Sequence, residues 1–136
     1  MPEPRDLPAV LQMRVVLTAS NYREAVAFYR DGLGLSLLAE FSNEHGDGLV
    51  LEAGHATLEI LDAGHAGWVD TIEAGGLVGL PVRIAFQVTD AQAAATALVE
   101  EGMRLVAPPA VTPWNSLNAR IEAPDAMQLT LFTELS

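Results

Sequence analysis

MRVVLTASNYREAVAFYRDGLG, at residues 13–34, reads as a strand that leads into a helix ending at a glycine. A second stretch with the same layout, VRIAFQVTDAQAAATALVEEG, occupies residues 82–102. Each begins its apolar strand with an arginine, Arg14 in the first and Arg83 in the second, 69 residues later. The repeat indicates two copies of one supersecondary unit, since two copies at this spacing are too few and too far apart for a solenoid.

The first copy is expected to contain a helix followed by three short strands. Asn21 with Glu24 three residues later is typical of a helix start. The helix ends at Gly32 or Gly34, where a glycine can stop it. Apolar and aromatic residues recur on one helix face: Tyr22, Ala25, Val26 and Tyr29. Three strand-like segments separated by turn residues follow, at 35–41, 48–53 and 56–62.

The second copy repeats this order after a glycine-rich stretch. Residues 63–81 contain five glycines and little periodicity, so we expect a connector with room for one short helical turn. Asp90 is the expected N-cap of a helix that runs to Glu101 and stops at Gly102. Three more strands are expected at 103–109, 117–123 and 127–133. The predicted fold is α+β: two tandem β-α-β-β-β modules, 13–62 and 82–134, forming one curved mixed sheet around a cleft within a single domain, 1–136.

Composition limits the classes of function. The net charge is −11, with 18 acidic and 7 basic residues, which argues against nucleic acid because phosphate binding needs a basic face. No apolar run is long enough to cross a membrane, and MPEPRDLPAV lacks the apolar centre of a signal peptide. Residues 1–11 carry three prolines and are expected to be an irregular lead-in. With no cysteine, a cytoplasmic location is expected.

Strand alternation predicts which side chains face the cleft. Successive side chains point to opposite faces of a strand, and the fully apolar faces must lie under the helices. The mixed faces then turn towards the cleft. Four charged or polar residues are therefore expected on the concave side, at equivalent points of the two modules: Arg14, Glu59, Arg83 and Thr130.

The tandem modules resemble the vicinal oxygen chelate superfamily, which includes glyoxalase I, extradiol dioxygenases and bleomycin resistance proteins. YREAVAFYRDGLGL, residues 22–35, is similar to that family's first helix and turn. TPWNSLNARIEAPDAMQLTLF, residues 112–132, is similar to its closing signature. The chain departs from the family pattern at Asn115, where a glycine is usual, and at Ala123 and Ala126, where Asp and Gly are usual.

The resemblance implies where a metal would bind, and the residues at those positions argue against one. Metal-dependent relatives use four cleft positions, which correspond here to Arg14, Glu59, Arg83 and Thr130. Only Glu59 is a usual ligand, because a guanidinium has no acceptor and stays protonated. Zinc needs about four ligands, or three and a water. We therefore expect no metal and no other cofactor.

The three histidines do not restore a metal site in this interpretation. His55 lies four residues before Glu59, which is about 13 Å along a continuous strand. His45 and His65 fall in predicted loops and are expected to be solvated turn residues.

The charged residues on the concave side predict one ion pair and one arginine whose donors remain for a ligand. Glu59 alone in an apolar cleft would be costly, so one arginine is expected to neutralise it while the other serves an anionic or carbonyl-bearing ligand. Which arginine does which is open, and a purely structural polar cluster is the alternative. Phe41, Trp114 and Phe132 are candidates for the cavity wall, where aromatic rings can stack on a flat ligand. Trp68 is more typical of packing.

Three functions remain open at this point. The first is a metal-independent small-molecule-binding protein, similar to the antibiotic-sequestering relatives. The second is a metal-free enzyme in which Glu59 is the catalytic base, although a neighbouring guanidinium would weaken that base. The third is a metal-dependent lyase, isomerase or dioxygenase of the same superfamily. A homodimer is expected in each case, because relatives pair their sheets across a two-fold axis.

Overall fold

The computed structural model of the protein describes residues 10–123 and 126–136. The first module contains β1 (Val10–Ala19), α1 (Tyr22–Val26), the π-helical turn η1 (Ala27–Gly32), β2 (Ser36–Asn43), β3 (Gly46–Ala53) and β4 (Ala56–Asp62). Helix α2 (Ala63–Ala74) follows. The second module contains β5 (Val82–Val88), α3 (Ala91–Glu100), β6 (Arg104–Val111), β7 (Ser116–Glu122) and β8 (Gln128–Glu134). This order confirms the predicted α+β fold of two β-α-β-β-β modules.

The eight strands form one mixed sheet in the order β2-β3-β4-β1-β5-β8-β7-β6. β1 and β5 pair antiparallel at its centre, and each has the last strand of its own module as a parallel neighbour. Val16 and Ala85 each lie two residues after the repeated arginine of their module. Val16 lies opposite Glu59 in the first module, and Ala85 lies opposite Thr130 in the second. The strand registers of the two modules therefore correspond. The duplication that the sequence indicates is therefore present in the strand pairing.

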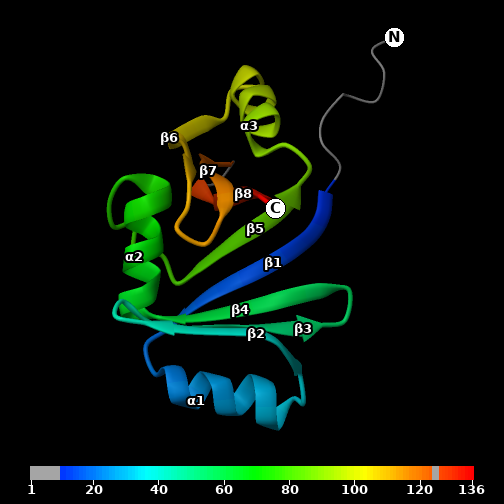
Figure 1. The fold of residues 1–136 in the computed structure, drawn as a ribbon, viewed down its shortest axis with the longest axis vertical. Coiled ribbons are helices and arrows are strands. Elements are labelled where there is room, and N and C mark those ends of the chain that lie inside the picture. The colour runs from blue at the N-terminus through cyan, green and yellow to red at the C-terminus, as the bar shows by residue number, and fades with distance from the viewer. Residues whose placement is uncertain (1–9, 124–125) are drawn as a thin grey trace.

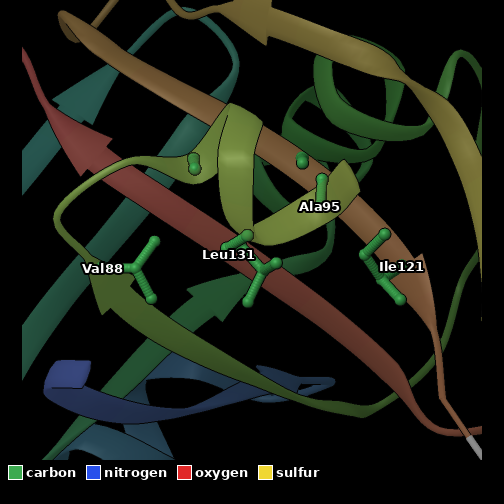
Figure 2. Close-up of a cluster of buried hydrophobic side chains, with 7 residues drawn as sticks. Val88, Ala95, Ile121 and Leu131 are labelled. Carbon is green, nitrogen blue, oxygen red and sulfur yellow. The ribbon is translucent and has the colours of Figure 1, made fainter. Parts of the chain in front are cut away.

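Helices α1 and α3 cover the outer, convex face of the sheet at its two ends (Figure 1). Asn21 and Asp90 cap them as predicted, each accepting a backbone N–H three residues later at 3.1 Å. Beneath α3, Val88, Ala95, Ile121 and Leu131 form part of a buried cluster contributed by three strands and the helix (Figure 2). The apolar strand faces therefore lie under the helices, as strand alternation predicts.

An irregular N-terminal lead-in was predicted over residues 1–11, and residues 1–9 of it lie outside the described part of the chain. Its last two residues, Val10 and Leu11, already belong to β1, and Val10 pairs with Val88 of β5. The first strand is therefore longer than the apolar alternation predicted.

The prediction of a mostly irregular connector was wrong, because α2 runs for twelve residues. Asp62 caps its start by accepting the backbone N–H of His65 at 2.8 Å, and Gly75 ends it in a left-handed conformation at φ 76°. The helix buries polar as well as apolar side chains, including His65, Asp70 and Glu73. An apolar helical pattern was therefore missing from its sequence.

Helix α2 lies at the open side of the curved sheet, between the two modules (Figure 1). It contacts β1, β3 and β4 of the first module and β6 and β7 of the second. None of the helices in the described ranges is long and apolar enough to span a lipid bilayer. The position of α2 brings its side chains onto the concave face, where no residue of the segment 63–81 was predicted.

Candidate functional site

A cavity of about 430 Å³ lies on the concave face of the sheet, on one side of α2; we call it the first cavity. The four predicted charged and polar residues line it: Arg14, Glu59, Arg83 and Thr130. The three predicted aromatic residues also line it: Phe41, Trp114 and Phe132. Residues from both modules thus meet in a single space of a size that suits a small molecule.

Arg14 is the arginine that pairs with Glu59. Its Nη1 lies 3.5 Å from Oε1 of Glu59, and the two side chains are 20% and 15% exposed. Its Nε donates to the side chain of Gln12, and its guanidinium carbon lies 5.0 Å from the ring centre of Phe132. These contacts hold the Arg14 guanidinium between a carboxylate and an aromatic face.

Arg83 makes a different set of contacts. Its Nη1 donates to Oγ1 of Thr130 at 2.9 Å, and the Thr130 hydroxyl donates in turn to Oε1 of Glu73 at 2.7 Å. Within the described residues, no carboxylate lies within ion-pair distance of Arg83, and its Nε and Nη2 have no hydrogen-bond partner. Arg83 therefore keeps donors available in the cavity, whereas Arg14 is committed to Glu59.

A buried ionic network that the sequence analysis missed lies behind these residues. Arg120 of β7 is 1% exposed and contacts two carboxylates of α2. Its Nη2 lies 2.9 Å from Oε1 of Glu73, and its Nη1 lies 3.1 Å from Oδ1 of Asp70. Asn118 donates to Oε2 of Glu73 at 2.6 Å. Glu73 was not predicted as a site residue because it falls in the stretch predicted as irregular. An aspartate at Asp62, which can cap a helix, was the feature of the sequence that could have indicated α2.

The pKa of Glu73 is lowered although the side chain is fully buried. Burial is the largest single influence and would raise this pKa. The positive charges of Arg83 and Arg120 and the hydrogen bonds from Thr130 and Asn118 outweigh it. Glu73 is therefore a carboxylate at neutral pH, and it anchors α2 to the second module.

Aromatic side chains also line the first cavity. The rings of Trp68 and Trp114 meet edge to face, with centroids 5.4 Å apart. His45 stacks on Trp68 at 4.4 Å with an interplanar angle of 4°, and Phe41 lies 5.2 Å from His65. Trp68 thus belongs to the cavity wall as well as to the packing.

The prediction of solvated loop histidines was wrong for His65. Because Asp62 starts a helix, His65 lies in its first turn, where it is 5% exposed between Phe41 and Trp68. Its Nδ1 has no hydrogen-bond partner in the described part of the chain. His45 lies in the turn before β3, as expected, and His55 lies in the turn before β4.

The comparisons with known proteins decide the family. The model of the Glyoxalase/Bleomycin resistance protein/Dioxygenase superfamily matches residues 12–130 of the chain. The chain belongs to the glyoxalase/bleomycin resistance protein/dioxygenase superfamily. This confirms the resemblance seen in the sequence. Comparison with curated protein sequences gives no match.

Solved structures share this fold at low sequence identity. A hypothetical protein from Bacillus halodurans is 16% identical with a TM-score of 0.67, over 90% of this chain and 93% of that one. Methylmalonyl-CoA epimerase from Mycobacterium tuberculosis is 18% identical with a TM-score of 0.64, over 100% and 94%. The Streptomyces coelicolor methylmalonyl-CoA epimerase, solved with 2-nitronate-propionyl-CoA, is 19% identical with a TM-score of 0.63, over 96% and 100%.

One departure from the superfamily pattern has a backbone explanation. Asn115 replaces the usual glycine after Trp114 and adopts the left-handed conformation, with φ 64°. Asparagine tolerates this conformation better than most residues. Its side chain also donates to the carbonyl of Leu135 at 2.6 Å, which holds the turn against the end of the chain.

The residues at the superfamily's metal positions do not fit a divalent cation. Arg14 and Arg83 offer only donors and positive charge, and the Thr130 hydroxyl is already held between Arg83 and Glu73. In the described ranges, no three His, Asp or Glu side chains are grouped so that they could hold a metal ion.

We predict that the purified protein carries no stoichiometric zinc, nickel, iron or manganese. The physical reason is that two guanidinium groups beside Glu59 repel a cation and leave too few ligands for one. Elemental analysis of the protein, purified without chelator, measures this directly. A stoichiometric metal that disappears in Glu59→Ala would contradict the prediction.

A double-mutant cycle tests the pairing of Arg14 with Glu59. Arg14→Leu should lower the free energy of unfolding by about 1–3 kcal/mol, because it leaves a largely buried carboxylate unpaired. Adding Glu59→Gln should recover much of that loss, which urea unfolding would show as a coupling between the two sites. Additive effects in the cycle would contradict the pairing.

Proposed function

We propose that this protein binds a small molecule in the first cavity without a metal. The observation that carries the proposal is Arg83, a partly buried arginine whose Nε and Nη2 have no partner in the described chain. A guanidinium with unused donors in a mostly apolar cavity provides a strong, directional contact for a ligand acceptor. It stands where metal-dependent relatives are expected to carry a metal ligand.

The rest of the cavity indicates the chemistry of the ligand. Trp68 and Trp114 are in contact in its wall, which favours a flat ring system that stacks against them. Arg14 pairs with Glu59, whereas Arg83 donates from its Nη1 to Thr130, so Arg83 is the guanidinium on the strand floor that keeps donors for the ligand. The ligand class we propose is therefore a planar molecule that carries a carbonyl or carboxylate group.

Native mass spectrometry tests this proposal on the protein as it is purified. We expect a non-covalent adduct of a few hundred daltons with no metal mass, as the cavity of about 430 Å³ allows. Where no molecule co-purifies, a thermal-shift screen of planar aromatic carboxylates should give ligands that raise the melting temperature. A matched set of planar aromatic amines, which lack the acceptor, should give no comparable rise. Equal stabilisation by both sets would argue against Arg83 as the anchor.

A metal-free enzyme is the second candidate, because one oxygen of Glu59 is uncommitted. Oε2 of Glu59 accepts no hydrogen bond from the described residues, and Glu59 lines the same cavity. Structurally similar proteins include methylmalonyl-CoA epimerases. The other oxygen of Glu59 is held by Arg14 at 3.5 Å, whereas Arg83 keeps unused donors, and binding is therefore the first candidate.

Proton exchange distinguishes the two candidates. An enzyme with Glu59 as base would exchange the α-proton of methylmalonyl-CoA with deuterium from solvent, and Glu59→Gln would abolish the exchange. The binding function predicts no exchange above the background rate for the wild type or the variant. Exchange by the wild type that Glu59→Gln removes would make the enzyme the better conclusion.

We further propose that the protein is a homodimer. The outermost strands β2 and β6 leave sheet edges, and β2 is exposed along nearly its whole length, including Leu37 and Leu38 at 46% and 47%. Sedimentation equilibrium at micromolar concentration should give about twice the chain mass of 14.5 kDa. A mass equal to that of a single chain would contradict the dimer.

A further inference from the structure

Helix α2 has a second cavity on its other side. This second cavity has a volume of about 420 Å³ and is separate from the first. The helix turns Trp68, Val69 and Glu73 to the first cavity, and Ala63, Ala66 and Asp70 to the second. The walls of the second cavity are mostly aliphatic, with side chains from β1, β4, α2 and the segment after α2: Val16, Leu61, Ala66, Leu77 and Leu80.

An unpartnered buried amide lies in the wall of this second cavity. Gln128 of β8 is 5% exposed, and its Oε1 has no hydrogen-bond partner in the described chain. Among the described residues, the oxygen is the atom of this side chain that is fully enclosed without a partner. A buried amide left in this state costs stability, so the position favours a partner that enters the cavity. A glutamine amide can both accept and donate hydrogen bonds, so a group with one acceptor and one donor would complement it.

The charges around Gln128 are already balanced. Arg120 contacts Asp70 at 3.1 Å and Glu73 at 2.9 Å. The other oxygen of Asp70 accepts the backbone N–H groups of Val78 and Gly79, each at 3.1 Å. Arg83 lines both cavities and supplies the second positive charge that faces Glu73. Two carboxylates and two guanidinium groups leave no net charge for a charged ligand to neutralise.

We propose that the second cavity binds a small uncharged molecule with a carboxamide or hydroxyl head and a short aliphatic body. The head group would accept from and donate to the amide of Gln128. The aliphatic body would lie against Leu61, Leu77 and Ala66, where it replaces water on apolar surface. Arg83 lines both cavities, but the contacts proposed here are to Gln128 and the aliphatic wall, so the two proposals are tested with different probes and different variants.

Methyl NMR with three probes of one chain length tests the site. Pentanamide has the required head, pentanoate is its anionic counterpart and pentylammonium its cationic one. On protein with labelled methyl groups, pentanamide should shift Leu61 and Leu77 in a saturable way. The two charged probes should bind at least about ten-fold more weakly, because a buried charge would lack a counter-ion. Equal binding of all three, or no shift up to the solubility limit of pentanamide, would overturn the proposal and leave the amide satisfied by water alone.

Two variants locate the binding. Gln128→Leu should weaken pentanamide about three- to ten-fold, the contribution of a hydrogen bond of ordinary strength. Its melting temperature should not fall, because the replaced amide has no protein partner. Ala66→Leu should fill the cavity and abolish the shifts at Leu61. Unchanged pentanamide affinity in Gln128→Leu would contradict the assigned head-group contact, even if Ala66→Leu fails to fold.

Discussion

Glu73→Ala should lower the free energy of unfolding by about 3–5 kcal/mol, because it leaves a buried guanidinium without its main partner. Arg120 is 1% exposed and would keep only its contact with Asp70 at 3.1 Å. Asn118 and Thr130 would also lose the acceptor of their hydrogen bonds. Urea unfolding followed by circular dichroism measures the change. A loss under about 1 kcal/mol would mean that the network contributes little.

The matched control is the double variant Glu73→Ala with Arg120→Met. Removing both charges replaces a broken ion pair with apolar volume, so the double variant should be more stable than Glu73→Ala alone. The cycle isolates the coupling between the two residues. If the double variant is less stable than either single variant by an additive amount, the two residues do not act as a pair.

The pH dependence of Glu73 has a definite sign. Its pKa is lowered in the folded protein, so the unfolded chain holds the proton more tightly than the folded one. The stabilising contribution is therefore complete above the unfolded-state pKa of about 4.3 and is lost as the pH falls through the folded-state value. Glu73→Gln should remove this part of the acid sensitivity. Identical pH profiles of the melting temperature for both proteins would contradict it.

The second large effect is expected at Arg83, on binding rather than on stability. Arg83→Lys keeps the positive charge that faces Glu73 but loses the planar fork of donors. The free energy of unfolding should therefore change by less than about 1 kcal/mol. The affinity for a planar aromatic carboxylate should fall at least about ten-fold, because charge-assisted hydrogen bonds from a guanidinium are worth about 1.5–3 kcal/mol. Arg14→Lys is the matched control in the same cavity, and it should change the affinity much less.

Strand alternation was enough to bring the floor of the first cavity together from the sequence. Side chains on a strand alternate with a period of two, and this rule is local, so it holds before the sheet is known. The repeat then put Arg14 and Arg83 at equivalent points, and the common register of the two modules confirms that equivalence. The choice between the two arginines was not local. Which arginine pairs with Glu59 depends on the positions of the two guanidinium groups, and only the structure shows these positions.

The helix that buries polar residues could not be predicted from the sequence. Helix α2 turns His65, Asp70 and Glu73 inward, so its sequence lacks the apolar period that marks a helix packed on a core. Its glycines added the composition of a loop. These buried groups are stabilised by Arg120 and by backbone N–H groups from distant segments, and no local pattern contains those partners.

Calorimetric titration of the protein with 2-naphthoate in buffer containing EDTA tests metal-independent binding most directly. The first cavity predicts saturable binding to the wild type in the absence of metal, and at least about ten-fold weaker binding to Arg83→Lys. Binding that is absent in EDTA and appears only when zinc, nickel or manganese is added would contradict the account, as would equal affinity of the wild type and Arg83→Lys.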